Sequence, residues 1–163
     1  MNTELRKFIE CTNDIIVWDI DGTLTEARWN KKDIIFFDET DVDRLIRHKK
    51  GFNVGLQPIK LMQDIVENIA PHRQYTLSNT YGTLEDNNKN KMLDKYFSNI
   101  KKENRYYTRN IEEKNTILEM LIKENPNKKV IYISDSLDEL ISMNKYFLSS
   151  VYAYFTYFYN LNT

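Results

Sequence analysis

The sequence predicts an α/β fold in which helices cover both faces of a parallel β-sheet. Short apolar runs recur along the chain, and most of them end in a polar residue. Runs that are apolar throughout are typical of parallel strands buried on both faces. Stretches with helical spacing lie between these runs, and this alternation indicates strands joined by crossover helices.

Five strands are expected, each rich in apolar, β-branched or aromatic residues. The first and the fourth are the clearest, because Ile-Ile-Val-Trp and Val-Ile-Tyr-Ile are apolar or aromatic throughout. The fifth is strongly aromatic, which favours a sheet edge packed against a helix; a surface that stacks nucleobases is the alternative. In chain order, the strands are expected at about 14–19, 74–78, 105–108, 129–134 and 150–158.

Helices are expected before, between and after these strands. The clearest follows the third strand, where Ile117, Leu118, Leu121 and Ile122 share one helical face. In chain order, helices are expected near 2–11, 59–70, 84–98, 111–124 and 136–147. No internal repeat or low-complexity linker interrupts the pattern, so the whole chain, 1–163, is expected to form a single domain.

Composition limits the class of protein. The chain has 163 residues, of which 41% are hydrophobic and 29% charged, as in globular domains with a real core. Its formal net charge of −1 provides no basic field to attract nucleic acid or a membrane. The single cysteine, Cys11, excludes an intramolecular disulfide and suits a reducing compartment. Because no apolar signal core or spanning stretch is seen, a cytoplasmic location is expected, whereas the oligomeric state is not indicated.

Two aspartates, Asp19 and Asp21, follow the first strand. Their spacing points both side chains the same way, and ligands of open α/β sheets bind outside the carboxyl ends of strands. One carboxylate can attack phosphorus, while the other protonates the leaving oxygen and later activates water. Both would repel a phosphate dianion unless a hard cation lay between them, so Mg²⁺ is implied. An ordinary Asp-Gly turn is the structural alternative.

The segment Asp19-Ile-Asp21-Gly22-Thr23-Leu-Thr after an apolar run resembles the first motif of the haloacid dehalogenase superfamily. The resemblance implies a Rossmann-like three-layer α/β/α sandwich with a five-stranded sheet of order 5-4-1-2-3. Phosphatases of that superfamily carry the second aspartate, whereas its dehalogenases and transport ATPases do not, so Asp21 favours the phosphatase branch. By resemblance, Asp19 is the nucleophile, Asp21 the general acid and base, and Thr23 a phosphate-binding residue.

The superfamily requires three further elements, and the chain offers them in order. The first is a hydroxyl after the second strand, which Ser78 provides with Asn79 beside it. The second is a phosphate-binding lysine at the start of a helix. Lys114 fits, because a cation in a first helical turn is disfavoured unless an anion lies nearby. The third is an acidic group after the fourth strand, beginning at Asp135.

The acidic group departs from the usual pattern of the superfamily, which has Gly before the first aspartate and Asp four residues after it. Here Ser134 and Glu139 stand at those places, and Asp138 is a second acid within reach. Whether Asp138 or Glu139 serves the metal stays open, and helix capping is the structural alternative for the group. The expected metal ligands are Asp19, Asp21 through its backbone carbonyl, Asp135, and Asp138 or Glu139.

Residues 26–57 form an insertion between the first strand and the next helix. In the superfamily, insertions at this point cap the active site, and one of this size is expected to be a small flap that leaves the site open. Its basic run Arg47-His-Lys-Lys50 could contact phosphate or a nucleotide, or could be a solvated helix end.

The sequence therefore predicts a Mg²⁺-dependent phosphomonoester hydrolase that works through an aspartyl-phosphate. A nucleotide or another small phosphorylated metabolite is the expected substrate. One alternative is a phosphatase that acts on the end of a polynucleotide, because the site is expected to be open. Others are a phosphate- or nucleotide-binding regulatory module without useful turnover, and phosphoryl transfer to an acceptor other than water.

Overall fold

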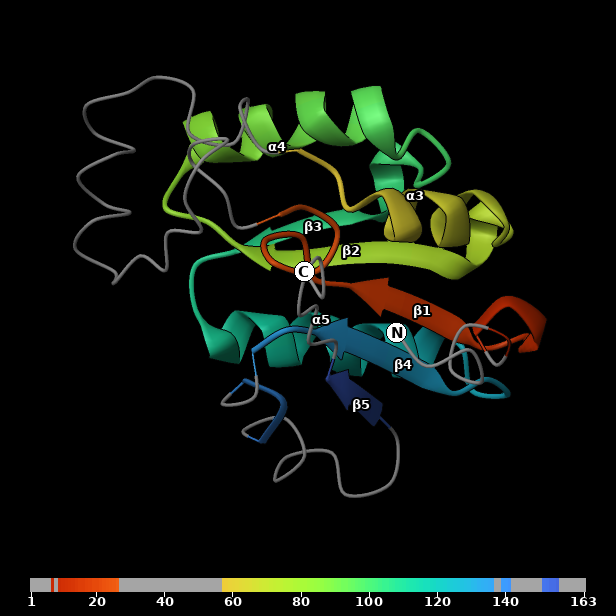
Figure 1. Cartoon of the computed structure of the whole chain (residues 1–163). Coiled ribbons are helices and arrows are strands. Elements are labelled where there is room, and N and C mark those ends of the chain that lie inside the picture. The colour runs from red at the N-terminus through yellow and green to blue at the C-terminus, as the bar shows by residue number, and fades with distance from the viewer. Residues whose placement is uncertain (1–6, 8, 27–56, 137–138, 142–150, 156–163) are drawn as a thin grey trace.

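A parallel β-sheet forms the centre of the structure (Figure 1). The computed structural model describes residues 7, 9–26, 57–136, 139–141 and, by their backbone, 151–155. The strands are β1 (Ile15–Trp18), β2 (Gln74–Asn79), β3 (Arg105–Thr108), β4 (Val130–Ser134) and β5 (Val151–Phe155). Strand β1 lies between β2 and β4, β3 lies beyond β2, and β5 pairs with β4, with every pairing parallel. The predicted α/β class with a parallel sheet is confirmed.

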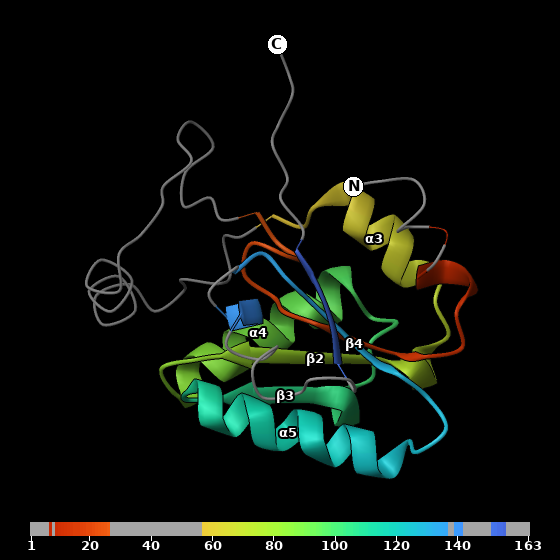
Figure 2. The same cartoon turned by 90° about the horizontal axis from the view of Figure 1, so that it is seen from below.

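Helices cover both faces of the sheet (Figures 1 and 2). Helices α3 (Lys60–Glu67) and α4 (Thr83–Tyr96) lie on one face, and α5 (Ile111–Glu124) lies on the other. Helix α5 spans the range expected for it, whereas α3 ends before the expected residue 70 because Pro71 begins a short 3₁₀ helix. The expected helices at 2–11 and 136–147 are described only in part, and residues 7, 9–11 and 139–141 are helical. The remaining residues of these two helices apart from 136, the last residues of the expected fifth strand and nearly all of the 26–57 insertion lie outside the described residues.

The side chains of β1 explain why the strand is apolar throughout. All four are buried, and they alternate between the two layers as the pleat requires. Ile16 and Trp18 pack with residues of α3 and α4, whereas Ile15 and Val17 pack with residues of α5. Because both faces of β1 are buried, its carboxyl end is held firmly at the centre of the sheet edge.

Gln74, a buried polar residue, orients Trp18, which directly precedes Asp19. Its side-chain amide donates to the carbonyls of Val66 and Ile69, 3.0 and 2.9 Å away, at the end of α3. Its carbonyl oxygen accepts a hydrogen bond of 3.2 Å from the indole Nε1 of Trp18. Since buried polar groups are tolerated only when they are paired, this network orients Trp18 and ties α3 to the sheet.

Among the described residues, no helix has both the length and the apolar character that crossing a membrane requires.

Candidate active site

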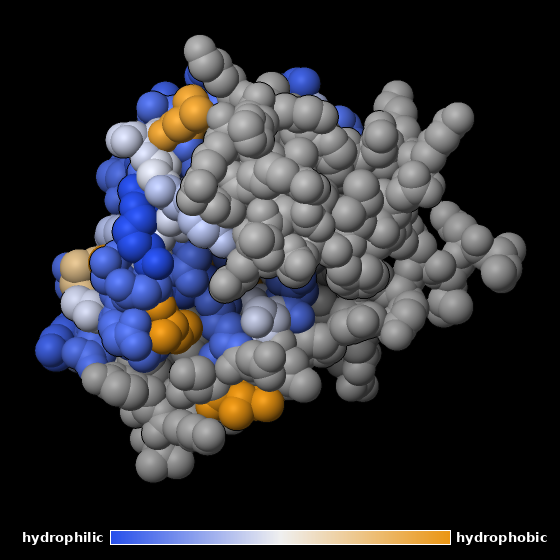
Figure 3. Space-filling model, turned by 90° about the vertical axis from the view of Figure 1, so that its left-hand side faces the viewer, coloured by the Kyte–Doolittle hydropathy of each residue, from blue (hydrophilic) through white to orange (hydrophobic). Residues whose placement is uncertain are grey.

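The carboxyl ends of β1, β2 and β4 meet at one edge of the sheet and carry Asp19, Ser78 and Asp135. The backbone N–H of Asp19 donates to the carbonyl of Ile133, 2.9 Å away, which extends the pairing of β1 with β4 up to the site. Figure 3 views the molecule from this side, where the described residues are mainly hydrophilic and the hydrophobic ones lie in separate spots. The sheet topology thus brings these three residues to one edge of the sheet.

Asp19 is buried among charged groups, with only 8% of its surface exposed. Its Oδ1 accepts a hydrogen bond of 2.8 Å from the backbone N–H of Ile20 and lies 3.7 Å from the Nζ of Lys114. Burial raises the pKa of Asp19 to about 7, against the lowering effect of Lys114. The negative charges of Glu139, Asp21 and Asp135 raise this pKa further. A carboxyl group in such an environment is a candidate for function.

The turn after Asp19 fits closely against the loop that follows β4. Gly22 has φ +73°, and a Cβ atom at this position would lie 2.0 Å from the Oδ2 of Asp135. The hydroxyl of Thr23 donates to the Oδ1 of Asp135 at 3.3 Å and accepts from its backbone N–H at 3.0 Å. Only glycine permits this approach, and the hydroxyl of Thr23, expected at the phosphate, lies against Asp135.

Lys114 reaches the site from the first turns of α5 and is almost completely buried. Its Nζ lies 2.5 Å from the Oε1 of Glu139 and donates to the hydroxyl of Tyr132 at 3.0 Å. The other carboxylate oxygen of Glu139 accepts from Tyr132 at 2.7 Å and from Ser134 at 3.1 Å. Of the two possible second acids, the structure therefore brings Glu139 to the site, whereas Asp138 lies outside the described residues.

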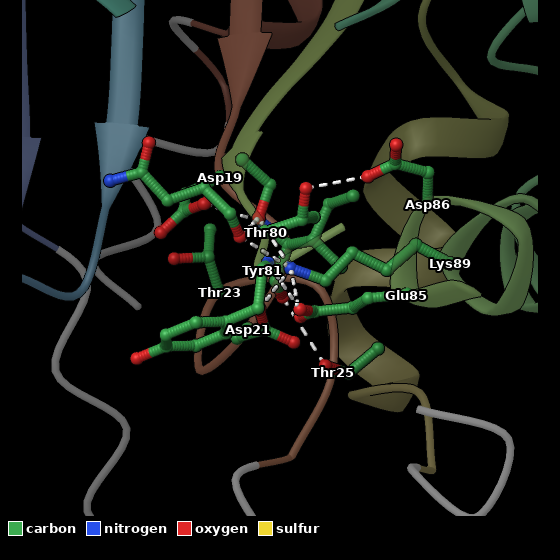
Figure 4. Close-up of polar contacts among 12 residues, drawn as sticks. Asp19, Asp21, Thr23, Thr25, Thr80, Tyr81, Glu85, Asp86 and Lys89 are labelled. Atoms are coloured by element: carbon green, nitrogen blue, oxygen red, sulfur yellow. Dashed lines mark hydrogen bonds and ion pairs between the residues drawn. The ribbon is translucent and has the colours of Figure 1, made fainter. Parts of the chain in front are cut away.

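Lys89, which the sequence analysis missed, is a second lysine at the site. It lies in α4 with 0% of its side chain exposed, and its Nζ is 2.5 Å from the Oδ2 of Asp21 (Figure 4). The same Nζ donates to the hydroxyl of Ser78 and to the carbonyl of Asn79, each 2.9 Å away, and lies 3.2 Å from Glu85. Burial lowers the pKa of Lys89, but Asp21 and Glu85 more than offset this, so that its pKa is raised and it stays charged.

Ser78 and Asn79 at the end of β2 differ in where their side chains lie. The Ser78 hydroxyl is part of the Lys89 cluster, as described above. The side-chain oxygen of Asn79 accepts a hydrogen bond of 2.7 Å from Thr108 on β3, so this group is directed to the neighbouring strand. Of the two residues expected to bind phosphate, Ser78 therefore has its hydroxyl at the site, whereas Asn79 contributes its backbone carbonyl as a partner of Lys89.

The rim of the site is held by a second set of ionic contacts. The hydroxyl of Thr80 donates to the Oδ1 of Asp86 at 2.5 Å, and the guanidinium of Arg109 contacts both of these residues. These residues come from the end of β2, from α4 and from the residue after β3. Beside them, the backbone N–H of Tyr81 donates to Glu85 at 2.8 Å (Figure 4). The contacts fix the start of α4, and hence Lys89, against the sheet.

The donor set determines which metal the site suits. In the part of the chain that the structure describes, no three carboxylate, imidazole or thiol side chains converge into a metal cluster. Mg²⁺ does not require one, because it commonly takes one or two carboxylates and keeps several waters. Asp19 and Asp135 fit that need, and the glycine cradle at Gly22 leaves the Asp135 carboxylate space that a Cβ would fill.

The balance of charge also favours a cation. Five carboxylates, against two buried lysines, lie in the clusters described above: Asp19, Asp21, Glu85, Asp135 and Glu139. Glu139 is engaged by Lys114, so Asp19 and Asp135 are the carboxylates that could hold a cation.

Comparison with known proteins gave no relative. No family model, no curated protein and no solved structure matches this chain. The interpretation of the site therefore depends on its own geometry.

The burial of Asp19 predicts how stability depends on pH when no metal is bound. Because the pKa of Asp19 rises from 3.8 to about 7 on folding, the native state binds this proton more tightly than the unfolded chain does. The stabilisation is complete below about pH 4 and is lost as pH rises to about 7. At pH 8 in EDTA, Asp19→Asn should therefore unfold at a higher urea concentration than wild type. Its free energy of unfolding should be higher by on the order of 2–4 kcal/mol.

The comparison needs a second pH and a control. At pH 5 the difference between Asp19→Asn and wild type should be much smaller, because native Asp19 is then protonated. Asp64→Asn, in the exposed i,i+4 pair with Lys60, should change stability little at either pH. If Asp19→Asn raises the free energy of unfolding equally at pH 5 and pH 8, or does not raise it at all, the assignment of a raised pKa to Asp19 is contradicted.

Proposed function

We propose that the protein is a Mg²⁺-dependent phosphomonoesterase that forms a covalent intermediate on Asp19. One observation carries the proposal: two carboxylates that follow the central strand each lie beside a different buried lysine. Asp19 lies 3.7 Å from Lys114, and Asp21 lies 2.5 Å from Lys89. Fully buried lysines are rare, so two at one sheet edge indicate a site built for charge. The two carboxylates also differ in environment, as two chemical roles require.

In the proposed reaction, an Oδ of Asp19 attacks phosphorus while the bond from phosphorus to the leaving oxygen breaks. A proton on the carboxyl oxygen of Asp21 that does not face Lys89 would pass to that leaving oxygen. Asp21 then takes a proton from water as the water attacks the phosphorus, which releases phosphate and restores Asp19. Lys114 and the hydroxyl of Ser78 would hold the phosphoryl oxygens, as positioning and electrostatics dominate phosphoryl transfer.

Mg²⁺ would be held by Asp19, Asp135 and the backbone carbonyl of Asp21, and when bound it would neutralise the charge of the phosphoryl group. Glu139 would support the site through its ion pair with Lys114. These assignments agree with the charge balance and with the space that Gly22 leaves at Asp135.

We further propose that the chain is a Rossmann-like three-layer sandwich of the haloacid dehalogenase superfamily, with the sheet order 5-4-1-2-3. The described strand pairings and the helices on both faces support this. The proposed substrate is a nucleotide or another small phosphorylated metabolite. A polynucleotide end as substrate stays a prediction from the sequence, since the 26–57 insertion lies almost wholly outside the described residues. A cytoplasmic location also stays a prediction from the sequence.

The proposal is tested by release of phosphate from p-nitrophenyl phosphate and a panel of nucleotides, with Mg²⁺ or with EDTA. We expect release that requires Mg²⁺. Asp21→Asn should lower kcat/KM for the nucleotides at least about 100-fold, because general acid–base catalysis contributes that much or more. Calorimetry should show that this variant still binds Mg²⁺, since Asp21 contributes only its backbone to the proposed metal site.

The same experiment separates an enzyme from a binding module. A folded wild-type protein that binds Mg²⁺ and nucleotides but releases no phosphate would contradict the proposal and favour the regulatory module. Analysis of products with added alcohols would reveal transfer to an acceptor other than water.

A further inference from the structure

Lys89 is a buried charged group beside Asp21 to which the proposed mechanism gives no role. A lysine with no exposed surface is destabilising unless its charge and its three donors are satisfied. Here the Nζ has four oxygen partners, on Asp21, Ser78, Asn79 and Glu85, all within 3.2 Å. Such complete pairing fixes the ammonium group in one place.

The hydrogen bonds of Lys89 leave it no donor for a substrate, because its three N–H groups are directed to Asp21, Ser78 and Asn79. Its side chain is fully enclosed, whereas the side chain of Asp21 is 41% exposed. Lys89 therefore lies behind Asp21, on the side away from solvent, and any effect on chemistry must pass through the residues it holds. Glu85 holds Lys89 from within α4, and is itself fixed by the backbone N–H of Tyr81.

We propose that Lys89 is a positioning residue that holds the carboxyl group of Asp21 in line with the leaving oxygen of the substrate; this rests on the proposed function. A half-exposed carboxyl group in a turn would otherwise sample several rotamers. Misplacement of a reacting group by about 1 Å can lower a rate about 100-fold. The contact of Lys89 with Ser78 also sets Asp21 relative to the hydroxyl that would bind phosphate.

The leaving group of the substrate distinguishes this role from a structural one. Departure of an alkoxide requires the proton of Asp21, which moves to the oxygen as its bond to phosphorus breaks. Departure of p-nitrophenolate requires no proton, because that anion is stable at neutral pH. A residue that positions the proton donor therefore affects alkyl phosphates far more than aryl phosphates.

The experiment compares kcat/KM for glycerol phosphate and for p-nitrophenyl phosphate in wild type and Lys89→Met. We expect a loss of about 10- to 100-fold on the alkyl ester and less than about 3-fold on the aryl ester. In an Asp21→Asn background, Lys89→Met should cause no further loss on either ester, since residues that act as a unit are not additive. Lys91→Met, an exposed lysine of the same helix, is the matched control and should leave both values unchanged.

A second variant guards against misfolding. Lys89→Met alone leaves the buried carboxylate of Glu85 without its lysine. The double variant Lys89→Met/Glu85→Gln removes both charges and keeps a side-chain oxygen that can accept the hydrogen bond from the backbone N–H of Tyr81. If Lys89→Met does not fold, the double variant replaces it in the experiment.

Each outcome decides the role of Lys89. Equal losses of kcat/KM on the two esters would overturn the positioning role in favour of a structural role. A change confined to a higher KM on both esters would overturn it in favour of a phosphate-binding role. Wild-type protein that hydrolyses neither these esters nor the nucleotides would overturn the proposed function together with this role. Selective loss on the alkyl ester, with an active wild type, supports both.

Discussion

Asp19→Asn is expected to abolish phosphate release while leaving the protein folded. An amide cannot form the acyl-phosphate bond, and removal of a nucleophile that acts as part of a unit lowers turnover by about 10⁴-fold or more. The initial rate of phosphate release with Mg²⁺, measured from pH 6 to 8, checks this. A rate within about tenfold of wild type would exclude Asp19 as the nucleophile.

The covalent intermediate provides an independent readout for the same variant. Acid quenching of wild type during turnover on a ³²P-labelled substrate should leave label on the protein that base then releases, as for an acyl phosphate. Asp19→Asn should carry none. Asp64→Asn, which removes an aspartate from α3, is the control and should be labelled as wild type is.

Gly22→Ala is expected to damage both stability and activity. The backbone of Gly22 has φ +73°, which side chains other than glycine rarely adopt, and the new Cβ would meet Asp135 at 2.0 Å. The turn must therefore shift, at about 1–3 kcal/mol for the backbone conformation alone. Because Asp21 and Asp135 flank this position, we expect kcat/KM to fall at least about 100-fold as well.

Gly82→Ala is a matched control for this substitution. Gly82 has an extended backbone, and nothing lies within 4 Å of a Cβ built there. Gly82 is the N-cap of α4, and its replacement by Ala should lower the free energy of unfolding by less than about 1 kcal/mol. Urea unfolding and phosphate release of the two variants should therefore differ widely, and closely similar behaviour would mean that the Gly22 turn tolerates a side chain.

The sequence predicted those parts of the site that local pattern determines. An apolar run that ends in Asp19 identifies a buried strand and its polar end, because strands covered on both faces are usually apolar throughout. The same logic located β4 and Asp135. Lys114 could be anticipated because a lysine in the first turns of a helix is unfavourable without an anion, and Asp19 lies 3.7 Å from it.

Other parts of the site depend on tertiary contacts. Glu85 and Lys89 have the i,i+4 spacing of an ordinary solvated helix pair, and only the packing of α4 on the sheet shows that they are buried. The position of Glu139 depends on tertiary contacts too, because the hydroxyls of Tyr132 and Ser134 donate hydrogen bonds to its carboxylate. The turn of Asn79 toward Thr108 requires the register of β2 with β3.

The two buried lysines enter from opposite faces of the sheet, Lys89 from α4 and Lys114 from α5. Under the proposed function, substitutions can therefore affect the two halves of the chemistry separately. Substitutions around Lys89 in α4 would alter protonation of the leaving group, whereas substitutions around Lys114 in α5 would alter binding of the phosphoryl group. Strand β1 and the turn after it serve both halves, so substitutions there should impair both at once.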